Sequence, residues 1–207
     1  MTPVLSLANV SKHFGGVQAL KNVDFELLPG EVHCLAGENG SGKSTLIKLI
    51  SGVYPAEPGT RMAIDGKPLT SMTPARARRA GLQVIWQDLA LFPEMTIAEN
   101  IAIEAVLGGA PRWVNHRRLR RTALATLERL GVELDVDARL GAFPIAQRQI
   151  VAIARALTVA ARVVFMDEPT ASLTHTETER LLAIVRRLCT DGIAVVFVSH
   201  RLAEVLA

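Results

Sequence analysis

The sequence has few cysteines and no long apolar segment. Cys34 and Cys189 are its two cysteines, and neither lies in a CxxC or Cys/His arrangement, so the sequence indicates neither a zinc site nor a disulfide framework. We therefore expect a reducing compartment. No apolar run approaches the roughly 20 residues that cross a bilayer, and the N-terminal residues lack the basic and apolar segments of a secretory signal. Any role at a membrane is expected to come through a partner.

The chain also lacks a long polar linker, a low-complexity tract and an internal repeat, so its 207 residues read as one unit. Hydrophobic residues make up 49% of the chain, which is enough for a substantial core. The formal net charge is +3 and the isoelectric point is near 9.2, a mild basic excess that suits polyanions but is ordinary for a soluble domain. Charge alone does not separate polyphosphate from nucleic acid as a ligand.

Short apolar runs alternate with helical segments along the chain. The run VHCLAG at 32–37 precedes a helix that begins at Lys43, and further apolar runs lie at 82–87, 162–168 and 193–200. Strands that are apolar on both faces and are separated by helices indicate a buried parallel sheet in an α/β fold.

Two parts of the sequence depart from this alternation. Residues 4–14, 23–32 and 61–70 carry alternation and turn signals that predict antiparallel strands; the turn signals are Pro29-Gly30 and Asp65-Gly66. From about 96 to 157 the sequence reads as nearly all helical, and a basic run within it places four apolar residues on one face: Leu119, Ala123, Leu127 and Leu130. We predict a single domain over 1–207, with an antiparallel β layer and a helical lobe at about 96–157 attached to the parallel core.

A phosphate-binding loop is predicted between the first apolar strand and the helix that follows it. Residues 37–44 match GxxxxGK[ST], and the matching residues are Gly37, Glu38, Asn39, Gly40, Ser41, Gly42, Lys43 and Ser44. Glycines let the loop wrap around phosphates, Lys43 neutralises β/γ-phosphate charge, and Ser44 offers a hydroxyl to Mg²⁺. The alternative is a glycine-rich turn with an incidental lysine, which the strand and helix on either side disfavour.

Polar residues end several of the predicted strands. Asp167 and Glu168 follow a buried strand, where adjacent carboxylates must be solvated, paired or metal-bound. Asp167 is the natural Mg²⁺ partner and Glu168 could polarise an attacking water; the alternative is an acidic loop that caps the next helix. His200 and Gln87 end two further strands at the same edge of the sheet, although a structural histidine and a surface glutamine are the common readings of such residues.

The stretch FPIAQRQIVAIARAL at 143–157 predicts a helix that begins without a Ser, Thr, Asp or Asn cap. Its first amides are therefore open to another acceptor. An ordinary core-facing stripe is predicted on the same helix, formed by Ala146, Ile150, Ile153 and Leu157.

With these elements in this order, the sequence resembles the ATP-binding cassette (ABC) ATPases, a group of P-loop NTPases. The resemblance covers essentially the whole chain. The segments KHFGGVQAL, SGVYPAEPG, IWQDLALFPEMTIAENI, PTASLT and VSHRLAEV are most similar to the ATPase subunits of bacterial monosaccharide importers of the ribose, galactose and xylose type. Such subunits usually carry two ATPase domains, and the first continues beyond a VSHRL segment. The chain, which stops at Ala207, is expected to be the first domain cut short before its last strands.

The resemblance implies roles for individual residues. Residues from Gly37 to Thr45 would bind ATP and Mg²⁺, with Ser44, Gln87 and Asp167 at the metal. Gln87 would also couple this site to a transmembrane partner, Glu168 would activate water and His200 would sense the γ-phosphate. Phe14 matches the family's adenine-stacking aromatic, although it could simply be a core residue.

The resemblance also answers why the helix at 143–157 begins without a cap. The family's LSGGQ signature opens this helix and meets the γ-phosphate of ATP bound by an opposing domain. In that register the signature positions are Phe143, Pro144, Ile145, Ala146 and Gln147. Only Gln147 is kept, and Pro144 removes a hydroxyl and an amide donor, so we expect a weakened contact at the second composite site. Proline suits the first helical turn, and the missing cap leaves later amides free for an anion.

The partners implied are transmembrane permease subunits, a second ATPase domain and, indirectly, an extracytoplasmic sugar-binding protein. The location implied is the cytoplasmic face of the cell membrane. The alternative is a soluble ABC ATPase that acts on ribosomes or nucleic acid, to which the basic stretches 76–79 and 117–121 could contribute, although a solvated helix face is their commoner meaning. Because such ATPases usually hydrolyse ATP only as paired domains, we expect little turnover from the 207 residues alone.

Overall fold

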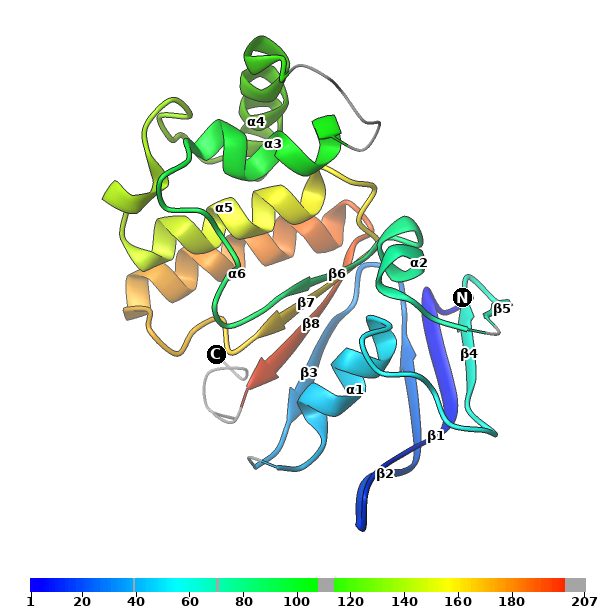
Figure 1. The fold of residues 1–207 in the computed structure, drawn as a ribbon. Helices are drawn as coiled ribbons and strands as arrows, with labels where there is room; N and C mark the ends of the chain where they lie inside the picture. Colours follow the sequence, from blue (N-terminus) through cyan, green and yellow to red (C-terminus); the bar gives the residue numbers. More distant parts are fainter. Residues whose placement is uncertain (39, 70, 108–113, 200–207) are drawn as a thin grey trace.

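The structure is a computed structural model that describes residues 1–38, 40–69, 71–107 and 114–199. Within these ranges the chain begins with three consecutive strands, and helices and further strands follow (Figure 1). The strands are β1 (Leu5–Phe14), β2 (Val17–Leu27), β3 (Val32–Ala36), β4 (Arg61–Ile64), β5 (Lys67–Leu69), β6 (Leu82–Ile85), β7 (Val163–Asp167) and β8 (Ala194–Ser199). The helices are α1 (Lys43–Ile50), α2 (Pro74–Arg79), α3 (Ile97–Leu107), α4 (His116–Leu130), the short 3₁₀ helix η1 (Leu140–Ala142), α5 (Ile145–Leu157) and α6 (His175–Thr190).

The centre of the fold is a parallel sheet with the strand order β3-β8-β7-β6. β8 is buried along its whole length and β7 everywhere except at Asp167, as expected for strands covered by helices on both faces. The strand predicted at 82–87 is shorter in the structure: β6 ends at Ile85, and a turn begins at Gln87. The parallel α/β core predicted from the apolar runs is confirmed.

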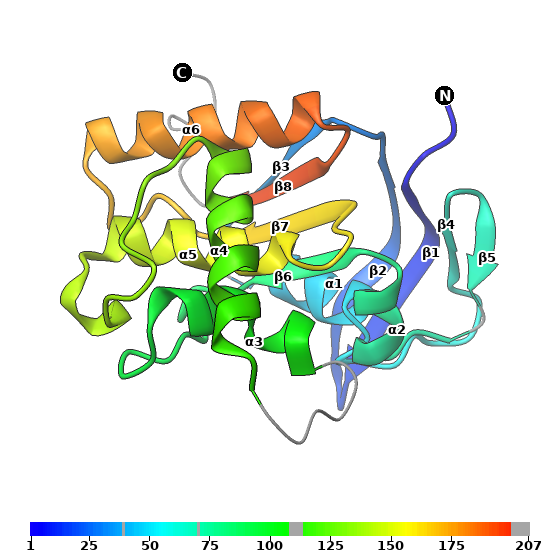
Figure 2. The ribbon, with the colours of Figure 1, turned by 90° about the horizontal axis from the view of Figure 1, so that it is seen from above.

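A second, antiparallel sheet has the order β2-β1-β4-β5. The predicted turn between β4 and β5 is present, with φ of 51° at Asp65 and 71° at Gly66, the left-handed conformation that tight hairpins require. Register shifts between β1 and β2 accompany Asn9 and Asn22, whose φ values are also positive. The predicted antiparallel β layer is therefore also confirmed, and Figure 2 shows it beside the parallel sheet.

One apolar cluster joins the two sheets through α1. Leu46, Ile47, Leu49 and Ile50 of this helix are buried with residues of both sheets, among them Leu5, Leu27, Phe165 and Val196. Full burial of such side chains contributes about 1.5–3 kcal/mol each. The start of α1 is thereby fixed relative to the end of β3, which positions the loop between them.

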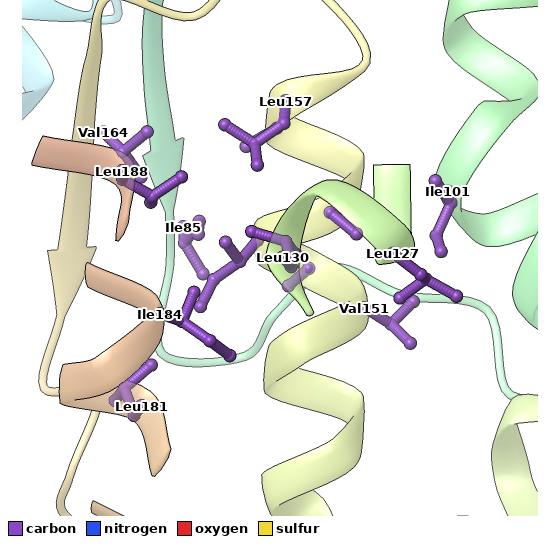
Figure 3. Close-up of a cluster of buried hydrophobic side chains, with 14 of the residues drawn as sticks. Ile85, Ile101, Leu127, Leu130, Val151, Leu157, Val164, Leu181, Ile184 and Leu188 are labelled. Atoms are coloured by element: carbon purple, nitrogen blue, oxygen red, sulfur yellow. The ribbon is translucent and has the colours of Figure 1, made fainter. Parts of the chain in front are cut away.

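A second apolar cluster packs α5 and α6 against the other face of the parallel sheet (Figure 3). Side chains of α3 and α4 belong to the same cluster. The predicted α4 face is confirmed, since Leu119, Ala123, Leu127 and Leu130 are each 3% exposed or less. The α5 stripe is correct only in part: Ile153 and Leu157 are buried, whereas Ala146 and Ile150 are half-buried. Residues 131–144 between α4 and α5 are mostly not helical, because Gly131 ends α4 with φ of 69° and Pro144 precedes α5.

Within the described ranges, no helix combines the length and apolar character needed to cross a bilayer.

Candidate functional site

Four parallel strands end at one edge of the central sheet. Ala36 of β3 pairs with Ser199 of β8, Asp167 of β7 pairs with Val198, and Ile85 of β6 pairs with Met166. The segments that follow these strand ends carry most of the residues singled out in the sequence. The carboxyl edge of a parallel sheet is where ligands bind in open α/β folds.

The predicted phosphate loop connects β3 to α1 at this edge. The Lys43 ammonium donates hydrogen bonds to the carbonyl oxygens of Gly37 (2.6 Å) and Glu38 (2.8 Å) and to the Ser41 hydroxyl (3.3 Å). The loop therefore encircles its own lysine, a positive group at the position where the sequence predicts negative phosphates. Asn39 lies outside the described residues.

Gly42 lets this loop approach β2 closely. Its φ is 93°, and a β-carbon added here would lie 2.6 Å from the Ala19 carbonyl oxygen. Gly40 also has a positive φ, of 86°, but a β-carbon there would meet nothing within 4 Å. Gly42 is thus required by packing, whereas Gly40 borders open space.

Helix α1 begins directly after Gly42, as predicted. Gly42 is the N-cap, has no side chain to cap the helix, and is followed by a first turn without acidic residues. The first-turn amides, which include those of Ser44 and Thr45, have no acceptor within the helix. Together with the helix dipole they create a site suited to anions.

The predicted carboxylates lie at the end of β7. Burial raises the pKa of the Asp167 carboxyl, and the neighbouring Glu168 carboxylate raises it further, whereas Lys43 and Lys48 lower it. Asp167 and the loop lysine therefore lie within electrostatic reach of each other. Glu168 has φ of 49°, and its amide donates to the Val198 carbonyl oxygen at 2.9 Å. This left-handed conformation costs about 1–3 kcal/mol, a strain typical of functional sites.

Gln87 is exposed in the turn after β6. A small pocket of about 60 Å³ brings it together with Asp167 and Glu168. Ile145, the first residue of α5, lines the same pocket. Four of the predicted site residues therefore share one pocket, although they come from three separate segments of the sequence.

The oxygen donors at this edge suit Mg²⁺. The candidate ligands are the Ser44 hydroxyl, the Gln87 amide oxygen and the Asp167 carboxylate, and Mg²⁺ takes one or two carboxylates and fills its other positions with water and phosphate oxygens. The raised pKa of Asp167 reflects a partly buried negative pair that a cation would stabilise. In the described ranges no three His, Cys, Asp or Glu side chains cluster as metal ligands, so an ion bound mainly by protein carboxylates or imidazoles is not indicated there.

Phe14 and His200 are the remaining predicted nucleotide contacts. Phe14, at the end of β1, is 42% exposed and is therefore not a core residue. Its ring lies edge-on to Tyr54 with centroids 5.1 Å apart. Figure 1 shows the end of the β1–β2 hairpin on the same side of the molecule as the loop before α1. His200 lies outside the described residues and directly follows Ser199, the last residue of β8.

The predicted uncapped start of α5 is present. Pro144 is the N-cap, one position earlier than the first-turn place expected for it, and no side chain caps the helix. The Pro144 carbonyl oxygen accepts from the amides of Gln147 and Arg148, both at 3.1 Å. Ile145 is 43% exposed and Ala146 and Gln147 are half-buried, so the start of the helix faces outward.

Sequence reasoning missed three sets of contacts around the site. The buried Gln149 amide donates to the Pro169 carbonyl oxygen at 2.6 Å, and Arg155 bonds the turn after Gln87. Glu57 accepts from the His13 amide at 2.6 Å and contacts the His13 ring at 2.9 Å, which ties the segment carrying Tyr54 to β1. Of these contacts, only that of Gln149 has a signal in the sequence, because Gln149 is a polar residue on a helix that is otherwise largely buried.

The basic stretches contact acidic and polar groups of the protein itself. Arg78 pairs with Glu104 at 3.1 Å, Arg120 pairs with Asp137 at 2.9 Å, and Arg76 bonds the Ser71 side chain. These exposed pairs match a solvated charged helix face and do not favour a nucleic-acid site.

A family model described as ABC transporter matches residues 20–171. The chain belongs to the ABC transporter family. An ATP-binding cassette of an ABC transporter, solved in an ADP conformation, is 29% identical and superposes with a TM-score of 0.86 over 100% of this chain and 84% of that one. A further crystal structure of such a cassette is 30% identical, with a TM-score of 0.88 over 100% of this chain and 85% of that one. The fold is therefore that of an ABC-type P-loop ATPase, as predicted.

Curated relatives from bacteria confirm the narrower resemblance. A ribose import ATP-binding protein of Streptomyces avermitilis is 50% identical over 98% of this chain, and one of Rubrobacter xylanophilus is 49% identical over 99% of it. The alignments cover 40% and 41% of those proteins. The chain thus spans about two fifths of the length of the curated relatives it matches.

Proposed function

We propose that this chain is an ATP-binding and ATP-hydrolysing domain that supplies energy for the import of a monosaccharide. The names of the relatives that are 49% and 50% identical, which are ribose import ATP-binding proteins, support this proposal. Because the chain spans about two fifths of those proteins, the import activity would belong to a longer protein or assembly. We assign one cassette to residues 1–207, with a helical lobe at about 96–157.

One observation carries the proposal. The lysine loop after β3, the carboxylates at the end of β7 and the glutamine after β6 meet at one edge of the parallel sheet. Each group alone has an ordinary structural meaning. Together they supply what phosphoryl transfer to water needs: positive charge and amides for the phosphates, oxygen ligands for a metal, and a base for water.

The residues would divide the work as follows. Lys43 would exchange its carbonyl partners, Gly37 and Glu38, for β/γ-phosphate oxygens, while the loop amides and the start of α1 bind the same phosphates. Ser44, Gln87 and Asp167 would hold Mg²⁺, which when bound neutralises phosphate charge.

Glu168 would orient and polarise the attacking water, and His200 would contact the γ-phosphate. Phe14 would stack on the adenine, for which its 42% exposure and its place at the end of β1 are suited. The pairing of Phe14 with Tyr54 would limit how far its ring can turn.

Helix α5 would serve a second nucleotide. Its uncapped start, at Pro144, Ile145, Ala146 and Gln147, would face the γ-phosphate of ATP bound by an opposing ATPase domain. Pro144 supplies no amide hydrogen and Ile145 adds bulk, so this contact would be weaker than one made by serine and glycine. Because each nucleotide would lie between two ATPase domains, rapid turnover would require a second ATPase domain as a partner.

The remaining partners would be permease subunits in the membrane, at whose cytoplasmic face this domain would sit, and indirectly an extracytoplasmic sugar-binding protein. Co-purification with a co-expressed permease of a sugar importer is the expected result. Salt-dependent binding of RNA or DNA without permease association would instead favour the nucleic-acid alternative.

Nucleotide binding is tested directly on the purified 207-residue chain with the fluorescent analogue MANT-ATP. Lys43→Ala should weaken binding by roughly tenfold or more, because a charge-assisted phosphate contact is lost. Lys67→Ala is the matched control, since Lys67 is exposed on β5 at the outer edge of the antiparallel sheet. Equal affinity in the wild type and Lys43→Ala would overturn the assignment of the loop, and brisk turnover by the isolated chain at every protein concentration would overturn the need for a second domain.

A further inference from the structure

The turn after Gln87 has an unusual backbone. Leu89 and Ala90 have φ values of 56° and 45°, so two consecutive residues with β-carbons occupy the left-handed region. Asparagine and glycine adopt this conformation readily, whereas other residues do so at a cost. Their amides are bonded within the turn, from Leu89 to the Trp86 carbonyl oxygen at 2.8 Å and from Ala90 to that of Asp88 at 2.7 Å. These local bonds close the turn but leave the Leu89 and Ala90 carbonyl oxygens to be satisfied elsewhere.

Arg155 supplies those donors from the last turns of α5. One terminal nitrogen donates to the Ala90 carbonyl oxygen at 2.5 Å and the other to the Leu89 carbonyl oxygen at 2.8 Å. The guanidinium is half-buried, and both carbonyl oxygens belong to the residues with positive φ. The two donors of a guanidinium are fixed in one plane, so their bonds to two successive carbonyl oxygens restrict the backbone conformation more tightly than the rotatable ammonium of a lysine would.

The surroundings of Arg155 show why its position is fixed. Its neighbours Ala154 and Ala156 are buried in α5, and the side chain of Leu89 is packed in the same apolar cluster as α5. Leu89 therefore anchors the turn through its side chain, while Arg155 bonds the backbone. Apolar packing alone leaves φ free to relax, because a leucine side chain can be buried from several backbone conformations.

We propose that Arg155 is a positioning residue that holds the turn carrying Gln87 in the conformation needed at the metal. This inference rests on the proposed function, in which Gln87 is a ligand of Mg²⁺. Because Ile145 at the start of α5 lines the same pocket as Gln87, one rigid helix would set both the Gln87 turn and the uncapped helix start. Arg155 itself would touch neither nucleotide nor metal.

The first test measures how much Mg²⁺ strengthens MANT-ATP binding to the purified chain. Gln87→Ala and Arg155→Met should each reduce this enhancement by roughly tenfold, as the loss of groups that position metal ligands commonly does. The double variant Gln87→Ala/Arg155→Met should lose no more than Gln87→Ala alone, because Arg155 acts through Gln87. Fully additive losses would overturn the proposal. Arg120→Lys, which alters an exposed ion pair at 2.9 Å, is the control.

The second test asks whether relieving the backbone removes the need for the arginine. Ala90→Gly should restore most of the Mg²⁺ enhancement to Arg155→Met, because glycine adopts positive φ without strain. Asp88→Gly is the matched control in the same turn, where φ is not positive, and it should restore nothing. Equal rescue by both glycines, or none by either, would show that Arg155 does not act on this conformation.

A spectroscopic measurement follows the turn without nucleotide. Trp86 and Trp113 are the two tryptophans, so Trp113→Phe leaves Trp86, next to Gln87, as the single reporter. Arg155→Met should increase acrylamide quenching of Trp86, and Ala90→Gly should reverse the increase. If every Arg155 variant fails to fold, Arg155→Lys included, and Ala90→Gly does not restore folding, Arg155 is a core residue and the proposal is wrong.

Failure of this inference and failure of the proposed function would give different results. If wild-type chain does not bind MANT-ATP through Lys43, the proposed function fails. If the wild type binds with strong Mg²⁺ enhancement and Arg155→Met keeps all of it, only the role of Arg155 fails.

Discussion

The side-chain amide of Gln149 donates a 2.6 Å hydrogen bond to the carbonyl oxygen of Pro169, and the glutamine is only 6% exposed. Gln149 lies in α5, and Pro169 directly follows the carboxylate pair at the end of β7. The bond thus joins the helix proposed to serve a second nucleotide to the loop that carries Glu168.

Replacement of Gln149 should destabilise the protein and loosen that loop. Gln149→Met keeps the shape but leaves the buried Pro169 carbonyl oxygen without its donor, a loss of about 1–3 kcal/mol in the free energy of unfolding. Urea unfolding followed by circular dichroism measures it. Gln18→Met, at an exposed position of β2, is the control and should stay within about 0.5 kcal/mol of the wild type. Equal effects at the two positions would contradict a structural role for the bond.

Gly40 and Gly42 of the phosphate loop should respond differently to alanine. Both have positive φ, so each substitution costs about 1–2 kcal/mol in backbone strain. Gly42→Ala also places a β-carbon 2.6 Å from the Ala19 carbonyl oxygen, whereas Gly40→Ala meets nothing within 4 Å. We expect Gly42→Ala to lower the free energy of unfolding by about 1–3 kcal/mol more than Gly40→Ala. Thermal unfolding of the two variants side by side is the measurement, and matching values would show that the loop can move away from β2.

Much of the candidate site at the carboxyl edge of the parallel sheet could be predicted, because its sequence signals are local. The spacing of Gly37, Gly42 and Lys43 after an apolar strand specifies a phosphate loop by itself, and Asp167 at a strand end is visible in the same way. The uncapped start of α5 is also a local property, since it depends on Pro144 and the residues next to it. Each of these features is encoded within about ten residues of sequence.

The contacts that hold these parts together could not be predicted because their partners lie far apart in the sequence. Arg155 and Ala90 are 65 residues apart, and His13 and Glu57 are 44 apart. The early end of β6 at Ile85 had no signal either, because the positive φ values that follow fall on leucine and alanine rather than on glycine. In that turn tertiary bonds override local preference.

Asp167 should destabilise the nucleotide-free protein at neutral pH. Burial and the neighbouring Glu168 raise its pKa, so the folded chain takes up this proton at higher pH than the unfolded chain does. Stability should therefore fall as pH rises from the ordinary to the raised pKa of this carboxyl, and the loss is complete above that interval. Asp167→Asn should remove this pH dependence and raise the melting temperature at pH 7.

Melting curves from pH 3.5 to 8, with and without Mg²⁺ and ATP, test both parts of this prediction. The wild type should gain more from Mg²⁺ with ATP than Asp167→Asn does, because the carboxylate that destabilises the free protein would bind the ion. Asp137→Asn, which removes an exposed ion pair with Arg120, is the control and should shift stability by less than about 1 kcal/mol. An Asp167→Asn protein that melts below the wild type at pH 7 without nucleotide would contradict the prediction.

Phe14 should distinguish the base of a nucleotide from its phosphates. Phe14→Ala removes the exposed ring at the end of β1 and should weaken ATP binding by about 1–3 kcal/mol, the range typical of an aromatic stacked on a base. Inorganic triphosphate carries no base, so its affinity, measured by displacement of MANT-ADP, should be equal in Phe14→Ala and the wild type. Phe14→Tyr keeps an aromatic ring, so its affinities for ATP and for triphosphate should both equal those of the wild type. Val17→Ala, on the strand position paired with Phe14, is the control for the hairpin itself. Competition titrations give the affinities, and a loss of triphosphate binding in Phe14→Ala as large as the loss of ATP binding would mean that the ring shapes the phosphate loop and does not contact the adenine.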